Sequence, residues 1–242
     1  ALSCALSASA YTGASDWAAA ELKKAEEYSL IPPSLESADV SKPITRSEFA
    51  SLSVKLYEAL GKTELKAAEV NPFSDTADAE VLKAYAAGIT TGTSDTTFEP
   101  DRSITRAEFA TLVVKALNLK SEISAGFTDV AEGAWYVPYV NAAANAGLIS
   151  GYAGEFRPED AITREEMAVV IVKTHQFRGG KLESGRISDF ADKDQIADWA
   201  VNYADQAVST GFISGITANT FGPKELATRA QVTAVLNRML NR

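Results

Sequence analysis

The sequence predicts a mostly α-helical protein built from four tandem helix–loop–helix units. The main observation is a Thr-Arg-x-Glu/Gln tetrapeptide that recurs four times, at spacings of 60, 58 and 65 residues. Each copy precedes apolar residues at the i, i+3, i+4, i+7 spacing of an amphipathic helix. Self-similarity at such periods is typical of repeat architectures, so we expect eight principal helices in four pairs. The four tetrapeptides lie at residues 45–48, 105–108, 163–166 and 228–231.

Composition excludes several classes of protein. The 242 residues are 46% hydrophobic and 23% charged, which is typical of a folded domain and not of a disordered chain. The net charge of −9 argues against nucleic-acid binding, which requires a basic face. No apolar run reaches 18 residues, so we expect no transmembrane segment. With one His and one Cys, zinc sites and His-based triads are disfavoured, and we expect no catalytic residues, metal or cofactor.

Residues 1–10 are predicted to be the remnant of a secretory signal peptide. They are small and apolar and end in Ala8-Ser9-Ala10, an A-x-A cleavage pattern. The alternative is an ordinary N-terminal arm. On the first interpretation the mature chain begins near Tyr11, is secreted, and lacks Cys4.

A second shared block precedes the last three tetrapeptides. It contains a Gly at the end of a predicted helix, where a left-handed C′ residue is favoured. A second Gly follows four residues later, and then a Phe-x-Pro segment, so each block predicts a loop of nearly constant length. In the first unit, Ser29-Leu30-Ile31 stands in place of the Gly and two apolar residues. The three helix-ending glycines are Gly88, Gly147 and Gly211.

The opening helix of each unit has its own markers. All three tryptophans stand twelve residues before the helix-ending Gly or its Ser29 counterpart, at Trp17, Trp135 and Trp199. An apolar-polar-Asp segment precedes this helix in the last three units, and its Asp is predicted to cap the helix. These opening aspartates are Asp75, Asp129 and Asp189. The resulting units span residues 13–61, 72–119, 127–176 and 187–242.

This order of motifs resembles the S-layer homology (SLH) domain of bacterial cell-surface proteins. The resemblance covers nearly the whole chain after residue 10. It implies a mostly helical fold in which three units form a pseudo-threefold spindle, here with an additional, partial N-terminal unit. It also implies non-covalent binding of secondary cell-wall polysaccharide, often pyruvylated, or of a peptidoglycan-linked glycan. The chain departs from the family pattern in its first unit and at Ala227 and Gln231.

The tetrapeptide predicts two different roles for its residues. Thr and Glu or Gln form a capping box that stabilises the helix by about 1 kcal/mol. The Arg occupies the first helical position, where a cation costs roughly 0.3–1 kcal/mol, so it needs a partner outside its helix. Either an opening aspartate of the next unit or an anionic ligand, such as a sugar carboxylate, satisfies this need. The resemblance favours the ligand. The four arginines are Arg46, Arg106, Arg164 and Arg229.

The candidate ligand-binding residues are therefore these arginines together with the tryptophans, opening aspartates and helix-ending glycines. The tryptophans either pack in the core or stack on a sugar face. Two functions remain open: attachment to the cell wall through an anionic polysaccharide, or a structural module that contacts surface-layer proteins and uses its arginines as clamps between units. An enzyme is disfavoured, because the repeat singles out no acid–base pair of carboxylates. Both remaining functions place the protein at the cell surface.

Overall fold

The computed structural model describes residues 11–61 and 63–240. The predicted signal-peptide remnant at residues 1–10, with Cys4, lies outside this part of the chain. The prediction of a mostly helical protein is confirmed, because the described residues form nine α-helices and two short 3-10 helices. The β-structure of the described residues is limited to isolated bridges between loop residues. The α-helices are α1 (Asp16–Glu27), α2 (Pro33–Glu36), α3 (Arg46–Gly61), α4 (Ala79–Ala86), α5 (Arg106–Ala116), α6 (Val137–Asn145), α7 (Arg164–Phe177), α8 (Val201–Ser209) and α9 (Arg229–Leu240).

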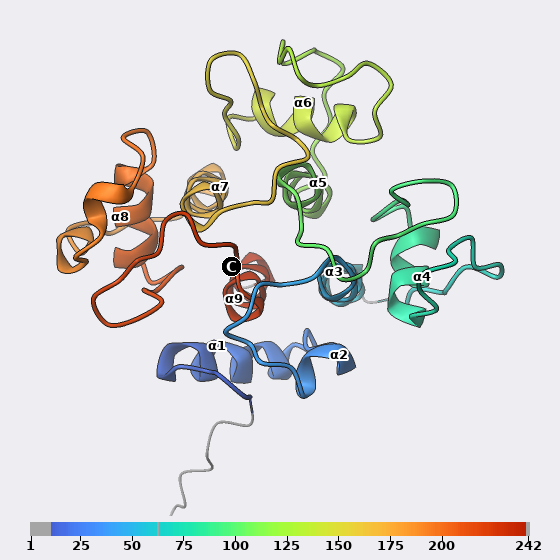
Figure 1. Cartoon of the computed structure of the whole chain (residues 1–242), viewed down its shortest axis with the longest axis horizontal. Helices are drawn as coiled ribbons and strands as arrows, with labels where there is room; N and C mark the ends of the chain where they lie inside the picture. The colour runs from blue at the N-terminus through green and yellow to red at the C-terminus, as the bar shows by residue number, and fades with distance from the viewer. Residues whose placement is uncertain (1–10, 62, 241–242) are drawn as a thin grey trace, which may run out of the picture.

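The four helices that follow the tetrapeptides form the centre of the molecule. Figure 1 shows α3, α5, α7 and α9 nearly end-on around the middle, with the other helices outside them. Each central helix begins at the motif Arg. The predicted capping boxes are present: in α5, for example, the Thr105 amide donates to Glu108 at 2.8 Å and the Glu108 amide donates to the Thr105 hydroxyl at 3.3 Å.

The outer helices close the units into a ring. Helix α4 packs against α3, α6 against α5 and α8 against α7, so each outer helix covers the central helix of the preceding unit. Helix α1 packs in the same way against α9, which joins the two ends of the chain. The threefold spindle with an additional unit is not confirmed; instead the N-terminal unit takes the fourth place in a closed, pseudo-fourfold ring (Figure 1).

The same backbone hydrogen bond joins each unit to the next at all four junctions between consecutive units of the ring. The amide of each motif Arg donates to the carbonyl four residues before the Arg of the next unit, at 2.7–3.0 Å. These bonds satisfy amides that the first turn of a helix leaves without a partner. At the fourth junction, between the last unit and the N-terminal unit, the acceptor is the carbonyl of Lys42. The N-terminal unit lacks several family motifs but keeps this segment, which closes the ring. The pairs are Arg46 with Arg102, Arg106 with Asp160, Arg164 with Glu225 and Arg229 with Lys42.

The glycine loops have the predicted geometry. Gly88, Gly147 and Gly211 have φ values of 64°, 72° and 80° and end the outer helices in the left-handed region. Ser29, which stands in the place of these glycines in the first unit, adopts the same conformation with φ of 57°. The loop phenylalanines Phe98, Phe156 and Phe221 are buried, so the loops are anchored to the core.

Candidate functional site

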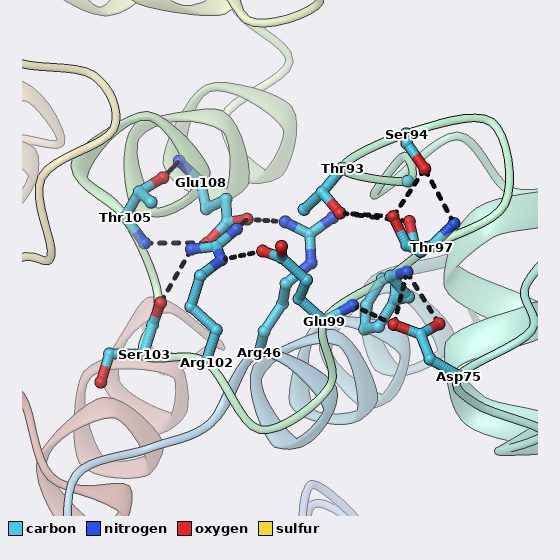
Figure 2. A network of polar contacts seen from close by, with 12 residues as sticks. Arg46, Asp75, Thr93, Ser94, Thr97, Glu99, Arg102, Ser103, Thr105 and Glu108 are labelled. Atoms are coloured by element: carbon cyan, nitrogen blue, oxygen red, sulfur yellow. Dashed lines mark hydrogen bonds and ion pairs between the residues drawn. The ribbon is translucent and has the colours of Figure 1, made fainter.

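The motif arginines contact the next unit of the ring. Arg106 forms an ion pair with Glu166 at 2.8 Å, and Arg229 pairs with Glu48 at 2.8 Å. Arg46 pairs in the same way with Glu108, as Figure 2 shows. The cation at the start of each of these helices is therefore compensated by the capping Glu of the following unit.

The prediction that an opening aspartate is the internal partner of the Arg is therefore wrong. Sequence reasoning missed the Glu because the capping box already explains it fully. One carboxylate does both tasks: Oε2 of Glu108 accepts from the Thr105 amide, while Oε1 accepts from Arg46.

Three of the four guanidinium groups also hold the Phe-x-Pro loop of the next unit. The Cζ atoms of Arg46, Arg106 and Arg164 lie 4.4, 4.7 and 5.1 Å from the ring centres of Phe98, Phe156 and Phe221. Nε of Arg106 donates to the carbonyl of Phe156 at 2.8 Å, and Nε of Arg164 donates to that of Phe221 at 2.9 Å. The arginines thus fix the position of the loop against the central helices.

Arg164 lacks the carboxylate that the other three arginines have. In the fourth unit the place of the capping Glu is taken by Gln231, whose Oε1 accepts from the Thr228 amide at 3.1 Å. Arg164 is fully buried, and its Nη1 has no hydrogen-bond partner among the described residues. Burial lowers the pKa of Arg164 to about 10. The departure at Gln231 therefore leaves an unpaired cation in the interior.

The opening aspartates fix the loops and do not cap the outer helices. Both oxygens of Asp75 accept from the backbone amides of the Phe98 loop at 2.7–3.0 Å, and these bonds hold the pKa of Asp75 below its ordinary value. Asp129 accepts from the amides of Phe156 and Arg157 at 2.8 and 2.5 Å. The predicted cap of α4 is wrong as well, because Asp78 caps that helix.

In the fourth unit the assignment of Asp189 is also wrong. Asp189 is exposed, 3.8 Å from Arg186, whereas Asp192 accepts from the amides of Phe221 and Gly222 at 2.7 Å. The true counterpart of Phe73-Ser-Asp75 is Phe190-Ala-Asp192, three residues further on. The aromatic residue two positions before the Asp is the signal that would have found it.

A groove of about 260 Å³ opens where three units meet. Its lining includes Arg106 at the start of α5, Lys173 of α7, and Trp199 and Tyr203 from α8 and the turn before it. Trp199 is 44% exposed, so its ring is accessible. We call this cavity the Trp199 groove. It combines cations, the Glu166 carboxylate that pairs with Arg106, aromatic faces and the hydroxyl group of Ser150 in one concave surface.

The sequence analysis did not single out Lys173. Its Nζ donates to Oγ of Ser150 at 2.7 Å and lies 5.5 Å from the ring centre of Tyr203. Burial lowers the pKa of Lys173. A Lys at the same distance after Arg46 and Arg106 was the available signal, but lysines near the ends of helices are common.

Comparison with known proteins identifies the repeat. The model of the S-layer homology domain matches residues 70–110, 126–168 and 189–233, more than half of the chain. The chain belongs to the S-layer homology family. The three matches fall in the second, third and fourth units of the ring, and the N-terminal SLH-like unit completes it.

Proteins of different kinds share this SLH segment. The chain is 37% identical over 180 residues to the exoglucanase XynX of Acetivibrio thermocellus, an alignment that covers 73% of this chain and 17% of that protein. It is 34% identical to a surface-layer 125 kDa protein of Lysinibacillus sphaericus, covering 72% and 15%. It is also 34% identical to a cellulosome-anchoring protein of Acetivibrio thermocellus, covering 68% and 36%. The chain thus spans well under half the length of these relatives.

The other two tryptophans of the SLH units have different surroundings. Trp135 lines the corresponding groove beside Arg46 and Glu108, which has a volume of only about 20 Å³. It is half-buried and packs edge-on against Tyr136, with ring centres 5.4 Å apart. Trp17 is half-buried against the cluster that joins α1 to α9. Equal positions in the repeat therefore give unequal exposure.

The helix-ending glycines lie outside the Trp199 groove. A Cβ atom added at Gly88, Gly147 or Gly211 would meet no atom within 4 Å, so these residues serve the backbone turn. Gly151 lines the groove instead, and a Cβ there would meet the ring of Phe127 at 2.6 Å. In the described part of the chain, no helix is long and apolar enough to span a membrane, and no cluster of three His, Cys, Asp or Glu residues could hold a metal ion.

Proposed function

We propose that this chain attaches non-covalently to the cell wall by binding an anionic secondary polysaccharide, such as a pyruvylated one, in the Trp199 groove. The observation that carries the proposal is the combination of an accessible indole with Arg106 and Lys173 in one cavity of about 260 Å³. A planar aromatic face suits the apolar face of a sugar ring, and a cation suits an acidic substituent on it.

The relatives support a binding module that has no enzymatic activity of its own. An exoglucanase, a surface-layer protein and a cellulosome-anchoring protein share this segment although their names describe different roles. The shared part is therefore better explained by attachment than by catalysis. On this proposal the protein is secreted and acts at the cell surface, where a wall polymer or a peptidoglycan-linked glycan is its partner.

A structural module without a sugar site is the second candidate. The ion pairs of Arg46, Arg106 and Arg229 favour it, because they show that these arginines join units of one chain. The two roles differ at Trp199, whose exposed ring has no part in joining the central helices.

Retention on purified cell walls tests the proposal. The wild-type chain should bind intact walls and lose binding after the secondary polymer is chemically stripped. Trp199→Ala should reduce retention. Tyr28→Ala removes a ring that is equally exposed but does not line the groove, so it should not reduce retention. Retention that survives stripping would point to a protein or peptidoglycan partner and would contradict the proposal.

A further inference from the structure

A lysine occupies the same place in three of the four central helices. Lys55, Lys115 and Lys173 each stand nine residues after the motif Arg. Each faces the outer helix that packs on its own central helix, at the residue four positions after the Trp position. This facing residue is Glu80, Tyr139 and Tyr203, respectively. The pairs thus offer an internal comparison of one site in several electrostatic settings.

The facing residue decides whether the lysine charge is neutralised. Lys55 lies 3.4 Å from Glu58 and 3.7 Å from Glu80, so two carboxylates surround it. Lys173 instead faces the ring of Tyr203, and no carboxylate of the described chain forms an ion pair with it. An aromatic face attracts a cation weakly and leaves its net charge available to a ligand.

The fourth junction carries a carboxylate at the facing position. Glu21 stands four residues after Trp17, and its Oε2 accepts from Asn237 of α9 at 3.3 Å. The side chain of Glu21 is 10% exposed and lies in a helix that packs on α9. Glu21 also pairs with Lys24 at 3.3 Å, so the facing position holds an ion-paired carboxylate in place of the aromatic ring.

The second junction has the right charge but little space. Nζ of Lys115 lies 4.7 Å from the ring centre of Tyr139 and also donates to the carbonyl of Gly88. The corresponding groove beside Trp135 encloses about 20 Å³, against about 260 Å³ beside Trp199. Lys55 lines a pocket of about 500 Å³, but its charge is neutralised by Glu58 and Glu80, so available charge and available volume coincide at Lys173.

We propose that Lys173 is the residue that recognises the anionic substituent of the sugar, and that the Trp199 groove is the principal binding site among the four related grooves of the ring. This inference rests on the proposed function and deepens it. A carboxylate and a phosphate on a sugar share the required chemistry, because the ammonium group of Lys is a point charge and does not demand a planar partner.

The three tryptophans make the proposal directly testable. They are the only tryptophans of the chain. Trp199 and Trp135 line two different grooves and Trp17 lies against the cluster that joins α1 to α9, so their indole N–H signals in a ¹⁵N-labelled sample report these three places separately. The probes are the 4,6-pyruvate ketal of methyl glucoside, glucose 6-phosphate and neutral methyl glucoside. We expect an anionic probe to shift the Trp199 signal in a saturable manner, at concentrations that leave the Trp17 signal in place. The neutral sugar should bind at least tenfold more weakly.

Substitutions at the repeated lysine provide matched controls. Lys173→Met and Lys173→Gln should weaken binding of the anionic probe by about ten- to a hundredfold, the range expected for a charge-assisted hydrogen bond. Lys55→Met, at the equivalent but neutralised position, should leave the Trp199 titration within twofold of the wild type. Thermal unfolding of each variant confirms that it is folded.

Several outcomes would overturn the inference. They are wild-type affinity in both Lys173 variants, equal affinity for neutral and anionic sugars, a Trp17 shift with the same midpoint as that of Trp199, or no response of Trp199 to either anionic probe. If walls retain the protein but the Lys173 variants are unaffected, the inference fails and the proposed function stands. If Trp199 responds as expected but walls do not retain the protein, the proposed function fails alone. The anionic probe that binds more tightly identifies the acidic group.

Discussion

Replacing Gln231 by Glu should stabilise the ring, because it supplies the carboxylate that Arg164 lacks. The other three junctions each contain an Arg–Glu pair, and the equivalent Glu108 and Glu166 also complete capping boxes. The substitution keeps the Thr228 cap, since Glu is as good as Gln at the third helical position. It differs from the wild type mainly in the charge presented to Nη1 of Arg164.

The expected gain follows from the burial of this arginine. An unsatisfied buried polar group costs about 1–3 kcal/mol, and the new bond is charge-assisted on both sides. Desolvation of the added carboxylate offsets part of the gain. We therefore expect Gln231→Glu to raise the free energy of unfolding by about 1–3 kcal/mol. For a chain of this size each kcal/mol corresponds to a Tm increase of about 2–4 °C.

Chemical and thermal unfolding measure this gain, and a double-mutant cycle assigns it to the pair. In an Arg164→Met background the same Gln231→Glu substitution should give no stabilisation, because it then buries a carboxylate without a cation. A stability at neutral pH that is unchanged or reduced by Gln231→Glu would refute the reasoning. So would an equal gain in the Arg164→Met background, since it would show that the carboxylate acts on something else.

Three further substitutions test the remaining contacts. Arg106→Ala should lower the free energy of unfolding by about 1–3 kcal/mol in urea titrations, because it removes the partner of Glu166 across the junction and the bond to the Phe156 carbonyl, while Arg157 still pairs with Glu166. Asp192→Ala should cost about 1–3 kcal/mol, whereas Asp189→Ala should change stability little; the reverse order would restore the original assignment. Burial lowers the pKa of Lys115 to about 8, below its unfolded value near 10.4, so the unfolded chain binds more protons between these pH values and stability rises with pH across this window. In Lys115→Met this rise should be absent, so the difference in the free energy of unfolding between the wild type and the variant should change with pH across this window. An identical pH dependence of both proteins would contradict the burial argument.

Local patterns predicted the parts of the fold that depend on local physics. Apolar periodicity placed the central helices, and the capping box placed their first residues. The left-handed conformation of Gly88, Gly147 and Gly211 followed from their place at the end of a predicted helix. These features depend on neighbours within a few residues, so a repeated sequence specifies them four times over.

Contacts between units could not be predicted in the same way. The motif Arg and its Glu lie in different repeats, and the local role of the Glu hid its second partner, as Glu108 shows. Within the fourth unit, two apolar-polar-Asp segments lie three residues apart, and the aromatic residue two positions before Asp192 distinguishes it from Asp189. Packing of α1 on α9 joins residues at opposite ends of the sequence, which no local pattern encodes.

Ring closure also explains why the Trp199 groove cannot belong to a single unit. Arg106 comes from the second unit, Lys173 from the third and Trp199 from the fourth. The backbone hydrogen bonds donated by the amides of Arg106 and Arg164 fix the second unit against the third and the third against the fourth. The three side chains therefore meet only when these units are correctly assembled. The N-terminal unit contributes no residue to the lining of this groove, but α1 packs on α9 and Glu48 pairs with Arg229, which holds the fourth unit from its far side. The ligand site is therefore a property of the assembled ring, and weakening either junction around the third unit should reduce binding even when the groove residues themselves are unchanged.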